Sequence, residues 1–429
     1  MSLLLDIAYA LAALLTSPFI LFKMVVSERW RAGFRQRFGG VPVREGKRPC
    51  VWIHAVSVGE VNAARRLIEL MESHHPDWDI RVSTITNTGQ RLARELFGDI
   101  RCFYFPLDFS FAVKRALRRV RPDAIVLVEL ELWPNFLRAA RKAGIPVIVV
   151  NGRMRAEKVS RYRRARFLFS PAMRPENGNL FCVQNETYRD RFERAGVPAE
   201  TIRVTGNMKY DALRTETDPE KVAALREALG IGPAEPVWAA GCTWPGEEDI
   251  CLRVHSILRE QEPALRLVIA PRHIERAAEV ERAVRASGYR PRRRTAPNDL
   301  SGPEIVPILD TVGELGYLYS LASFAFVGKS LTAAGGHNVL EASALGATPV
   351  FGPRTENFEA EVRLLIQADA AEEVNDEGEL AQALQKLLRY PELCRSRVER
   401  GRKAIEGARG AAERNLDAIR GVLAERPEN

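Results

Sequence analysis

The segment CVWIHAVSVGEVNAARRLIELM, residues 50–71, decides the fold class. Residues 50–56 form a nearly continuous apolar, β-branched run, which is typical of a strand buried on both faces. A turn follows at Ser57 to Glu60, and from Val61 onward apolar residues recur with helical spacing. A buried strand that runs directly into a helix is the basic unit of a parallel α/β sheet.

The same alternation continues through two halves of the chain. Further strand-like runs cover 80–85, 124–130, 146–151, 180–184 and 202–206, and then 236–241, 265–270, 304–308, 324–328 and 348–352. The polar stretch 211–220 separates the two series, and 429 residues are enough for two domains. The chain therefore predicts two Rossmann-like domains. The expected boundaries are an anchor at 1–27, a first domain at 28–212, a linker at 213–220, a second domain at 221–400 and a helical tail at 401–429.

The composition excludes several classes of protein. With 46% hydrophobic and 28% charged residues, the chain is neither disordered nor a polytopic membrane protein. Its six cysteines form no C-x-x-C pair, which favours a reducing compartment over a zinc or disulfide framework. The net charge of +8 suits anionic small molecules or an anionic membrane as well as it suits nucleic acid.

The N-terminal segment LLLDIAYALAALLTSPFILFKMVV, residues 3–26, is almost wholly apolar. Its uncharged run from 7 to 22 is slightly short of the roughly 20 residues that a spanning helix needs. Basic residues follow it, so the positive-inside rule places the remainder of the chain in the cytoplasm. We expect a single spanning or half-inserted membrane anchor, with a buried core helix as the alternative.

Ligands bind parallel sheets where strands end and helices begin, so the acidic residues at those turns are candidate site residues. Glu60 begins a helix after strand 50–56, where it either complements the helix dipole or acts as a general base. Glu129 and Glu131, in VELELWPN at 128–135, lie at the end of a buried strand, where their spacing of two residues predicts that they share one face. They then either meet a cation, a hydroxyl group or a substrate, or they form a solvated strand end.

A strongly basic run, RMRAEKVSRYRRAR at 153–166, follows the strand at 146–151. Seven cations and one acid in fourteen residues cannot balance locally. The run is therefore either a solvated face or a contact for phosphate or lipid headgroups.

The second half carries three comparable turns. Arg272 ends the strand in IAPRH (269–273), and Gly313-Glu314 open a helix in DTVGELGYLY (310–319). In AAGGHNVLEASALG (333–346), two glycines precede a helix that begins near Asn338, and Glu341 is placed to accept two ribose hydroxyls. Glycines before exposed helix N–H groups are typical of a phosphate site. Together these turns predict a nucleotide-binding second domain. No early strand is followed by G-x-G-x-x-G, which disfavours an NAD enzyme.

The ordered set of motifs resembles the 3-deoxy-D-manno-octulosonic acid (Kdo) transferases of Gram-negative bacteria. The resemblance rests on HAVSVGE, ELELWPN, NGRM, TGNMKYD, the GEE of WPGEED, APRH, DTVGELGYLY, FVGKSL, GGHNVLE and FGPRTENF. It implies a GT-B glycosyltransferase fold, with two Rossmann-like domains facing a cleft and an N-terminal membrane-anchor helix.

The resemblance also implies the reaction and its participants. An enzyme of this kind transfers Kdo from CMP-Kdo to the lipid A precursor at the inner membrane, with inversion. It needs no cofactor and no active-site metal, and it does not bind nucleic acid. By the likeness Glu60 is the catalytic base, supported by Ser57, Gly59, Glu129 and Arg153. The implied donor-binding residues are Pro271, Arg272, Val312, Gly313, Glu314, Asn338, Val339, Leu340 and Glu341.

Three residues near the implied donor site depart from the family pattern. Lys329 stands where a second glycine is usual, Trp244 where a histidine is usual, and Cys242 where a serine is usual. Lys329 either adds a cation near the donor phosphate or carboxylate or points to solvent. Two other functions stay open on the sequence: a GT-B transferase or epimerase that uses a UDP-sugar, and a non-catalytic membrane-surface protein.

Overall fold

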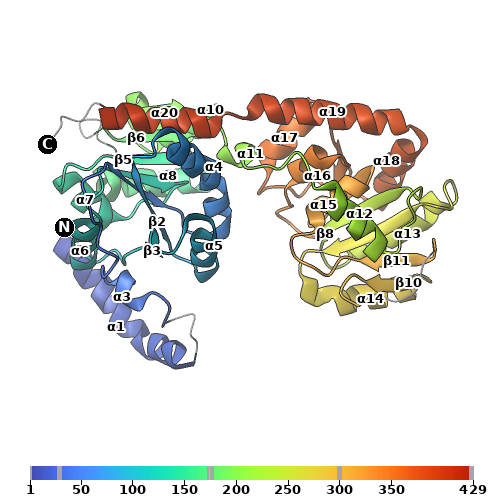
Figure 1. The fold of residues 1–429 in the computed structure, drawn as a ribbon, viewed down its shortest axis with the longest axis horizontal. Coiled ribbons are helices and arrows are strands. Elements are labelled where there is room, and N and C mark those ends of the chain that lie inside the picture. Colours follow the sequence, from blue (N-terminus) through green and yellow to red (C-terminus); the bar gives the residue numbers. More distant parts are fainter. Residues whose placement is uncertain (1, 27–30, 172, 174–177, 297–301, 425–429) are drawn as a thin grey trace. The chain divides into compact units, whose positions relative to one another are not determined.

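The computed structural model describes residues 2–26, 31–171, 173, 178–296 and 302–424. The chain divides into two compact units, one of Met1–Ala212 with Ala408–Asn429 and one of Leu213–Gly407. Each unit contains one seven-stranded parallel sheet (Figure 1).

The first unit is built on the sheet β3-β2-β1-β4-β5-β6-β7. Its strands are β1 (Cys50–His54), β2 (Asp79–Thr84), β3 (Cys102–Tyr104), β4 (Ala124–Val128), β5 (Val147–Gly152), β6 (Leu180–Val183) and β7 (Ile202–Val204). Its helices are α1 (Ser2–Val26), α3 (Phe34–Arg37), α4 (Val58–His74), α5 (Asn87–Phe97), α6 (Ser110–Val120), α7 (Pro134–Lys142), α8 (Ala156–Arg164), α9 (Arg166–Phe169), α10 (Glu186–Arg194), α11 (Met208–Asp211) and α20 (Ala411–Ala424). The strand order reverses between β1 and β4, which is where a doubly wound sheet binds its ligand.

Apolar helix faces cover both sides of this sheet. One core layer packs α6 and α7 against Trp52 and its neighbours on the sheet. The opposite layer packs α4 and α20 against it, for example through Leu67 and Ile419. The last helix, α20, therefore returns to the first unit, where Ala412 N–H donates to Asp211 at 2.6 Å.

The second unit repeats the plan with the sheet β10-β11-β9-β8-β12-β13-β14. Its strands are β8 (Val237–Thr243), β9 (Arg266–Pro271), β10 (Arg290–Arg293), β11 (Ile305–Ile308), β12 (Phe324–Val327), β13 (Thr348–Phe351) and β14 (Glu372–Glu373). Its helices are α12 (Pro219–Ala228), α13 (Glu247–Arg259), α14 (Ala277–Ala286), α15 (Leu315–Leu321), α16 (Val339–Leu345), α17 (Glu359–Gln367), α18 (Glu377–Arg389) and most of α19 (Pro391–Ala408). Here the order reverses between β8 and β12.

Every strand that the sequence pattern predicts is present, and three that it does not predict lie at sheet edges. These are β3 in the first sheet, and β10 and β14 in the second. An edge strand pairs on one side only and needs no apolar run, so sequences such as RPRR give no strand signal.

For the N-terminal helix α1, the structure argues against two of the positions that the sequence left open, the spanning anchor and the buried core helix. Among the described residues no helix is long and apolar enough to cross a membrane, so the spanning anchor is not supported. A buried core helix is wrong as well, because Leu4, Leu14 and Leu15 are 69–82% exposed.

Polar contacts near its start hold α1 on the first unit. The Asp6 carboxylate accepts the Ser110 backbone N–H at 2.9 Å, and the Tyr9 hydroxyl donates to Asp108 at 3.2 Å. Burial raises the pKa of Asp108 to about 6, although the N–H groups of Asn135 and Phe136 also donate to it.

Candidate functional site

The first group of predicted residues lies at the carboxyl edge of the first sheet, on both sides of its switch point. Helix α4 begins at Val58, three residues earlier than its apolar spacing predicts, so Glu60 sits in its first turn. The Glu60 carboxylate accepts the Val56 N–H at 2.8 Å and the Ser57 hydroxyl at 3.2 Å. These bonds fix the carboxylate above the end of β1.

Glu60 is tuned for proton transfer near neutral pH. Burial, helped by the negative charges of Glu129 and Glu131, raises the pKa of Glu60 to about 7, against the lowering effect of its two hydrogen bonds. A base whose pKa lies near the working pH is the most effective.

Glu129 lies across the switch point, after β4. Its carboxylate accepts Arg153 Nε at 2.8 Å, and Lys209 Nζ lies 3.3 Å from its other oxygen. Its side chain is only 14% exposed, so the two cations offset the cost of burying it. Lys209 was not singled out in the sequence, although it lies in the TGNMKYD motif.

The prediction that Glu129 and Glu131 share a strand face is wrong. Strand β4 ends at Val128, and Glu129 has a φ of 63°, so both glutamates lie in the loop that leads to α7. The left-handed backbone turns the chain and breaks the alternation of a strand. Burial still raises the pKa of Glu131.

The sequence predicts that Gly59 lets the backbone turn closely into the helix, and this prediction is wrong. It lies in the first turn of α4, where an added Cβ would meet nothing closer than the Ser57 hydroxyl at 3.9 Å. The backbone therefore does not require glycine there, and the missing side chain instead leaves open space beside Glu60. A close approach between two backbone segments occurs instead at Gly89, where an added Cβ would lie 3.2 Å from the Ser57 carbonyl carbon.

Most of the predicted basic run is a solvated face. Arg153 pairs with Glu129, whereas the run from Arg155 onward forms α8 and α9, where only Val159 is buried. Phe167, between these cations, is 55% exposed.

The second group of predicted residues lies at the carboxyl edge of the second sheet. Pro271 is the last residue of β9, and the Arg272 N–H donates to Thr243 O at 3.1 Å, at the end of β8. Arg272 is exposed, beside Cys242 and His337. Val312 and Gly313 form an open turn in which Val312 is 84% exposed. Glu314 stands at the N-cap position of α15 without a side-chain capping bond, and its carboxylate accepts Arg294 at 3.2 Å.

The glycine-rich turn leads into α16 as predicted. Asn338 caps this helix by accepting the Leu340 N–H at 3.1 Å. Val339 and Leu340 are buried, so their side chains belong to the core and only their backbone can face a ligand. Burial raises the pKa of Glu341, and the nearest cation acting on it is Arg214.

A buried glutamate that the sequence did not single out holds the donor-side loops in place. Glu247 is 0% exposed, and its carboxylate accepts the N–H groups of Trp244 at 2.9 Å, Lys329 at 2.7 Å and Ser330 at 2.9 Å. Gly328 is required beside it, because an added Cβ would lie 2.6 Å from the Glu247 carboxylate. The loops after β8 and β12 are thus joined across the second switch point.

Lys329 is placed at this switch point with a left-handed backbone. Its φ is 59°, and its ammonium group lies 5.0 Å from the centre of the Trp244 ring. Burial lowers the pKa of His337 to about 4, with Arg272, Lys329 and His273 adding to the effect. The cations of Arg272 and Lys329 therefore lie close to an imidazole that burial keeps neutral.

Backbone strain marks both switch points. Among the described residues six non-glycine side chains have positive φ, and four of them stand at strand ends: Glu129, Asn151, Cys242 and Lys329. Such conformations cost about 1–3 kcal/mol each and persist where surrounding contacts enforce them, often at functional sites.

Comparison with known proteins gives consistent similarities. Residues 32–212 match the family model described as 3-deoxy-D-manno-octulosonic-acid transferase (kdotransferase). A 3-deoxy-D-manno-octulosonic acid transferase of Haemophilus influenzae is 31% identical over 97% of this chain and 98% of its own length. One from Bordetella pertussis is 33% identical over 86% of each chain.

Solved structures with low sequence identity share the fold. A glycosyltransferase from Rickettsia africae has a TM-score of 0.61 at 11% identity, over 89% of this chain and all of its own. A putative UDP-N-acetylglucosamine 2-epimerase from Listeria monocytogenes has a TM-score of 0.60 at 13% identity, over 89% of this chain and 99% of its own. At this identity the likeness concerns the architecture, a GT-B-like pair of α/β units.

Proposed function

Since this chain belongs to the 3-deoxy-D-manno-octulosonic acid (Kdo) transferase family, we propose that it transfers Kdo from CMP-Kdo to a hydroxyl of the lipid A precursor, with Glu60 as general base. The chain is a glycosyltransferase acting in lipopolysaccharide biosynthesis. A UDP-sugar enzyme is the weaker alternative, because the epimerase likeness rests on 13% identity and on fold alone.

The observation that carries the role of Glu60 is its position and its pKa of about 7 at the first switch point. The acceptor hydroxyl gives its proton to the Glu60 carboxylate while its oxygen attacks the anomeric carbon of Kdo. The bond from that carbon to the phosphate oxygen breaks, and CMP leaves with the electron pair. Attack from the face opposite to CMP inverts the anomeric centre. Glu129, held by Arg153 and Lys209, keeps a negative charge near Glu60 and so maintains its raised pKa.

The second unit supplies the donor contacts in this proposal. Arg272 and Lys329 offset the charge that develops on the departing CMP phosphate. Asn338 and the backbone of Val339 and Leu340 form the turn beneath it, and Glu341 accepts the ribose hydroxyls. Pro271 and the exposed turn Val312–Glu314 complete the proposed surface for the nucleotide.

We further propose that α1 lies along the cytoplasmic surface of the inner membrane, half-inserted in one leaflet. The support is its row of exposed leucines, the contacts of Asp6 and Tyr9 that hold its start on the first unit, and the basic residues that follow it. A lipid acceptor resides in such a surface, so this position gives the enzyme access to it.

Mass spectrometry of the lipid product tests the proposed function. Purified full-length protein, CMP-Kdo and lipid A precursor are incubated, and a mass increase by one or more Kdo units is expected. The same incubation with a UDP-sugar in place of CMP-Kdo should leave the acceptor unchanged. Transfer from the UDP-sugar but not from CMP-Kdo would replace this proposal with the alternative.

A further inference from the structure

We propose that a hollow at the outer edge of the first sheet binds the phosphate group of a lipid. The hollow has a volume of about 700 Å³, and the residues that line it include Arg31, Arg35, Arg94, Arg119 and Tyr104. None of its lining residues is an aspartate or a glutamate. This inference rests on the proposed function, which supplies a phosphorylated lipid as the acceptor.

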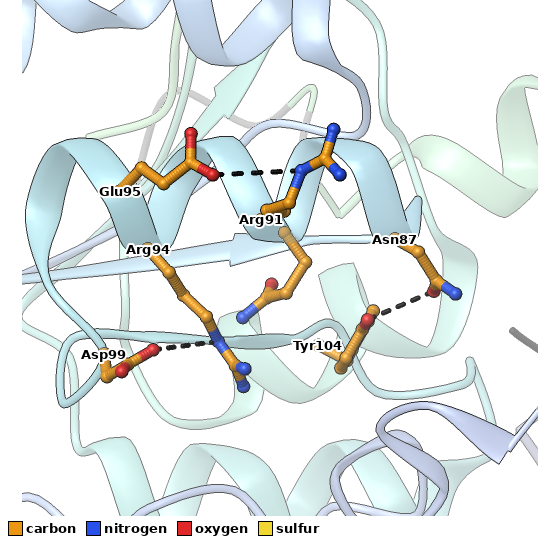
Figure 2. A pocket seen from close by; sticks show the side chains of 7 residues that line it. Asn87, Arg91, Arg94, Glu95, Asp99 and Tyr104 are labelled. Carbon is orange, nitrogen blue, oxygen red and sulfur yellow. Dashed lines mark hydrogen bonds and ion pairs between the residues drawn. The ribbon is translucent and has the colours of Figure 1, made fainter. Parts of the chain in front are cut away.

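A neighbouring hollow, in which the arginines are paired with acids, shows what is particular to the arginines of the first hollow. It has a volume of about 450 Å³ and shares Arg94 and Tyr104 with the first (Figure 2). Its charges compensate one another, because Arg91 lies 3.8 Å from Glu95 and Arg94 lies 3.4 Å from Asp99. In the first hollow, on the other side of Tyr104, the positive charges are not compensated in this way, because no carboxylate of the described residues pairs with Arg31 or Arg35.

The backbone that frames this hollow is held firmly against Tyr104. Gly33 has a φ of 68°, and an added Cβ there would lie 1.9 Å from the Tyr104 ring. Gln36 Oε1 accepts the Tyr104 N–H at 2.8 Å, and the Arg37 guanidinium lies 4.7 Å from the ring centre. Arg37 also donates to Ile85 O at 2.8 Å. The segment with Arg31 and Arg35 is thereby fixed to the end of β3.

The Tyr104 end of the hollow lies at the carboxyl edge of the sheet, the edge that carries Glu60. Tyr104 is the last residue of β3, and its hydroxyl donates to Asn87, the first residue of α5, at 3.1 Å. The Thr86 hydroxyl, one residue earlier, donates to Val56 O at 3.2 Å, and the Val56 N–H binds Glu60. Strands β3 and β1 are two places apart, roughly 10 Å. In this proposal a phosphorylated glycolipid places its phosphate in the hollow while one of its sugar hydroxyls reaches Glu60.

Two lipids carry this chemistry: the phosphorylated glycolipid acceptor and the surrounding anionic phospholipid. Arginine guanidinium groups bind phosphate through charge-assisted, often bidentate hydrogen bonds. Arg31 lies five residues after the end of α1 at Val26, and in this proposal a lipid surface against α1 supplies either phosphate.

The test compares full-length wild-type protein with the double variant Arg31→Ala/Arg35→Ala. The matched control is Arg189→Ala/Arg194→Ala, which removes the same charge from the exposed face of α10. Initial rates are measured with the phosphorylated acceptor and with the same glycolipid after phosphatase treatment. Flotation with phosphatidylcholine vesicles, with and without phosphatidylglycerol, reports lipid binding without any turnover.

If the hollow binds the acceptor phosphate, the double variant raises KM for the phosphorylated acceptor at least tenfold and leaves KM for the dephosphorylated acceptor unchanged. If it binds phospholipid, KM rises equally for both acceptors and flotation with phosphatidylglycerol vesicles falls. Either result supports the proposal. Rates and flotation equal to those of the control would overturn it. Failure of the proposed transferase function gives a different pattern, with no product from any variant while flotation still tests the hollow.

Discussion

The Glu60 carboxylate reaches back over the first turn of α4 and accepts the Val56 backbone N–H at 2.8 Å. The bond joins the end of β1 to the start of the helix. It therefore fixes the carboxylate at the switch point between β1 and β4. It also gives the side chain a structural role as a cap, beside the role of base.

The substitution Glu60→Gln separates these roles. Its amide oxygen still accepts one hydrogen bond but removes no proton, so we expect kcat to fall about 10²- to 10⁴-fold. CMP binding, measured by titration calorimetry, should be unchanged. The control Glu69→Gln changes an exposed pair on the same helix and should retain full activity. Normal turnover by Glu60→Gln would exclude Glu60 as the base.

The same variant should affect stability in a pH-dependent way. The folded-state pKa of Glu60 lies above its ordinary value of 4.5, so ionising it opposes folding. This penalty is absent below pH 4.5 and grows as the pH rises toward 7. Thermal denaturation should therefore show Glu60→Gln gaining stability over wild type across that window. A stability difference between Glu60→Gln and wild type that shrinks as the pH rises would contradict the raised pKa.

Catalysis itself should depend on pH through Glu60. Below pH 7 the carboxylate is increasingly protonated, so kcat/KM should fall about tenfold per pH unit, with an apparent pKa near 7. The variant Glu129→Gln removes a nearby negative charge and leaves the positive charges of Arg153 and Lys209 less compensated. Both changes lower the pKa of Glu60, so the acidic limb of the profile of kcat/KM against pH should move to lower pH. Glu157→Gln, on the exposed face of α8, is the control, and an equal shift in both variants would argue against a specific coupling.

Lys329 offers a test in which charge and backbone strain act separately. Lys329→Ala removes the ammonium group but keeps a side chain at a φ of 59°, whereas Lys329→Gly removes both. We expect both variants to raise KM for CMP-Kdo about 10-fold or more, the loss of one charge-assisted contact. Only the glycine variant should gain stability, by about 1 kcal/mol in chemical denaturation. Unchanged KM in both would place Lys329 outside the donor site.

The exposed face of α1 can be tested by vesicle flotation. Leu14→Gln/Leu15→Gln changes two side chains that are 69% and 82% exposed, so the folded protein should lose no stability. Each leucine that enters the bilayer contributes about 1.5–3 kcal/mol, so association should fall at least tenfold. Ile366→Gln, an exposed residue on α17, should leave association unchanged. Equal binding by all three proteins would show that α1 does not contact lipid.

The sequence determined the strand–helix units, because apolar runs and helical spacing follow from local chemistry alone. It predicted the paired sheets, and the carboxyl-edge positions of Glu60, Glu129, Arg272 and Asn338, since ligand turns follow strands in any doubly wound sheet. The sequence pattern did not predict short edge strands such as β3, because three residues paired on one side carry no periodic signal.

Only the tertiary structure decided what those residues meet. The left-handed turn at Glu129 sets its carboxylate between Arg153 and Lys209, 24 and 80 positions along the chain. Glu247 joins two loops that are 82 residues apart, and the Tyr104 hollow gathers arginines from three segments. The pKa of Glu60 likewise depends on burial and on charges from another loop. Residue types and spacing fix local conformation, whereas distances between remote side chains arise only when the sheet aligns its strand ends.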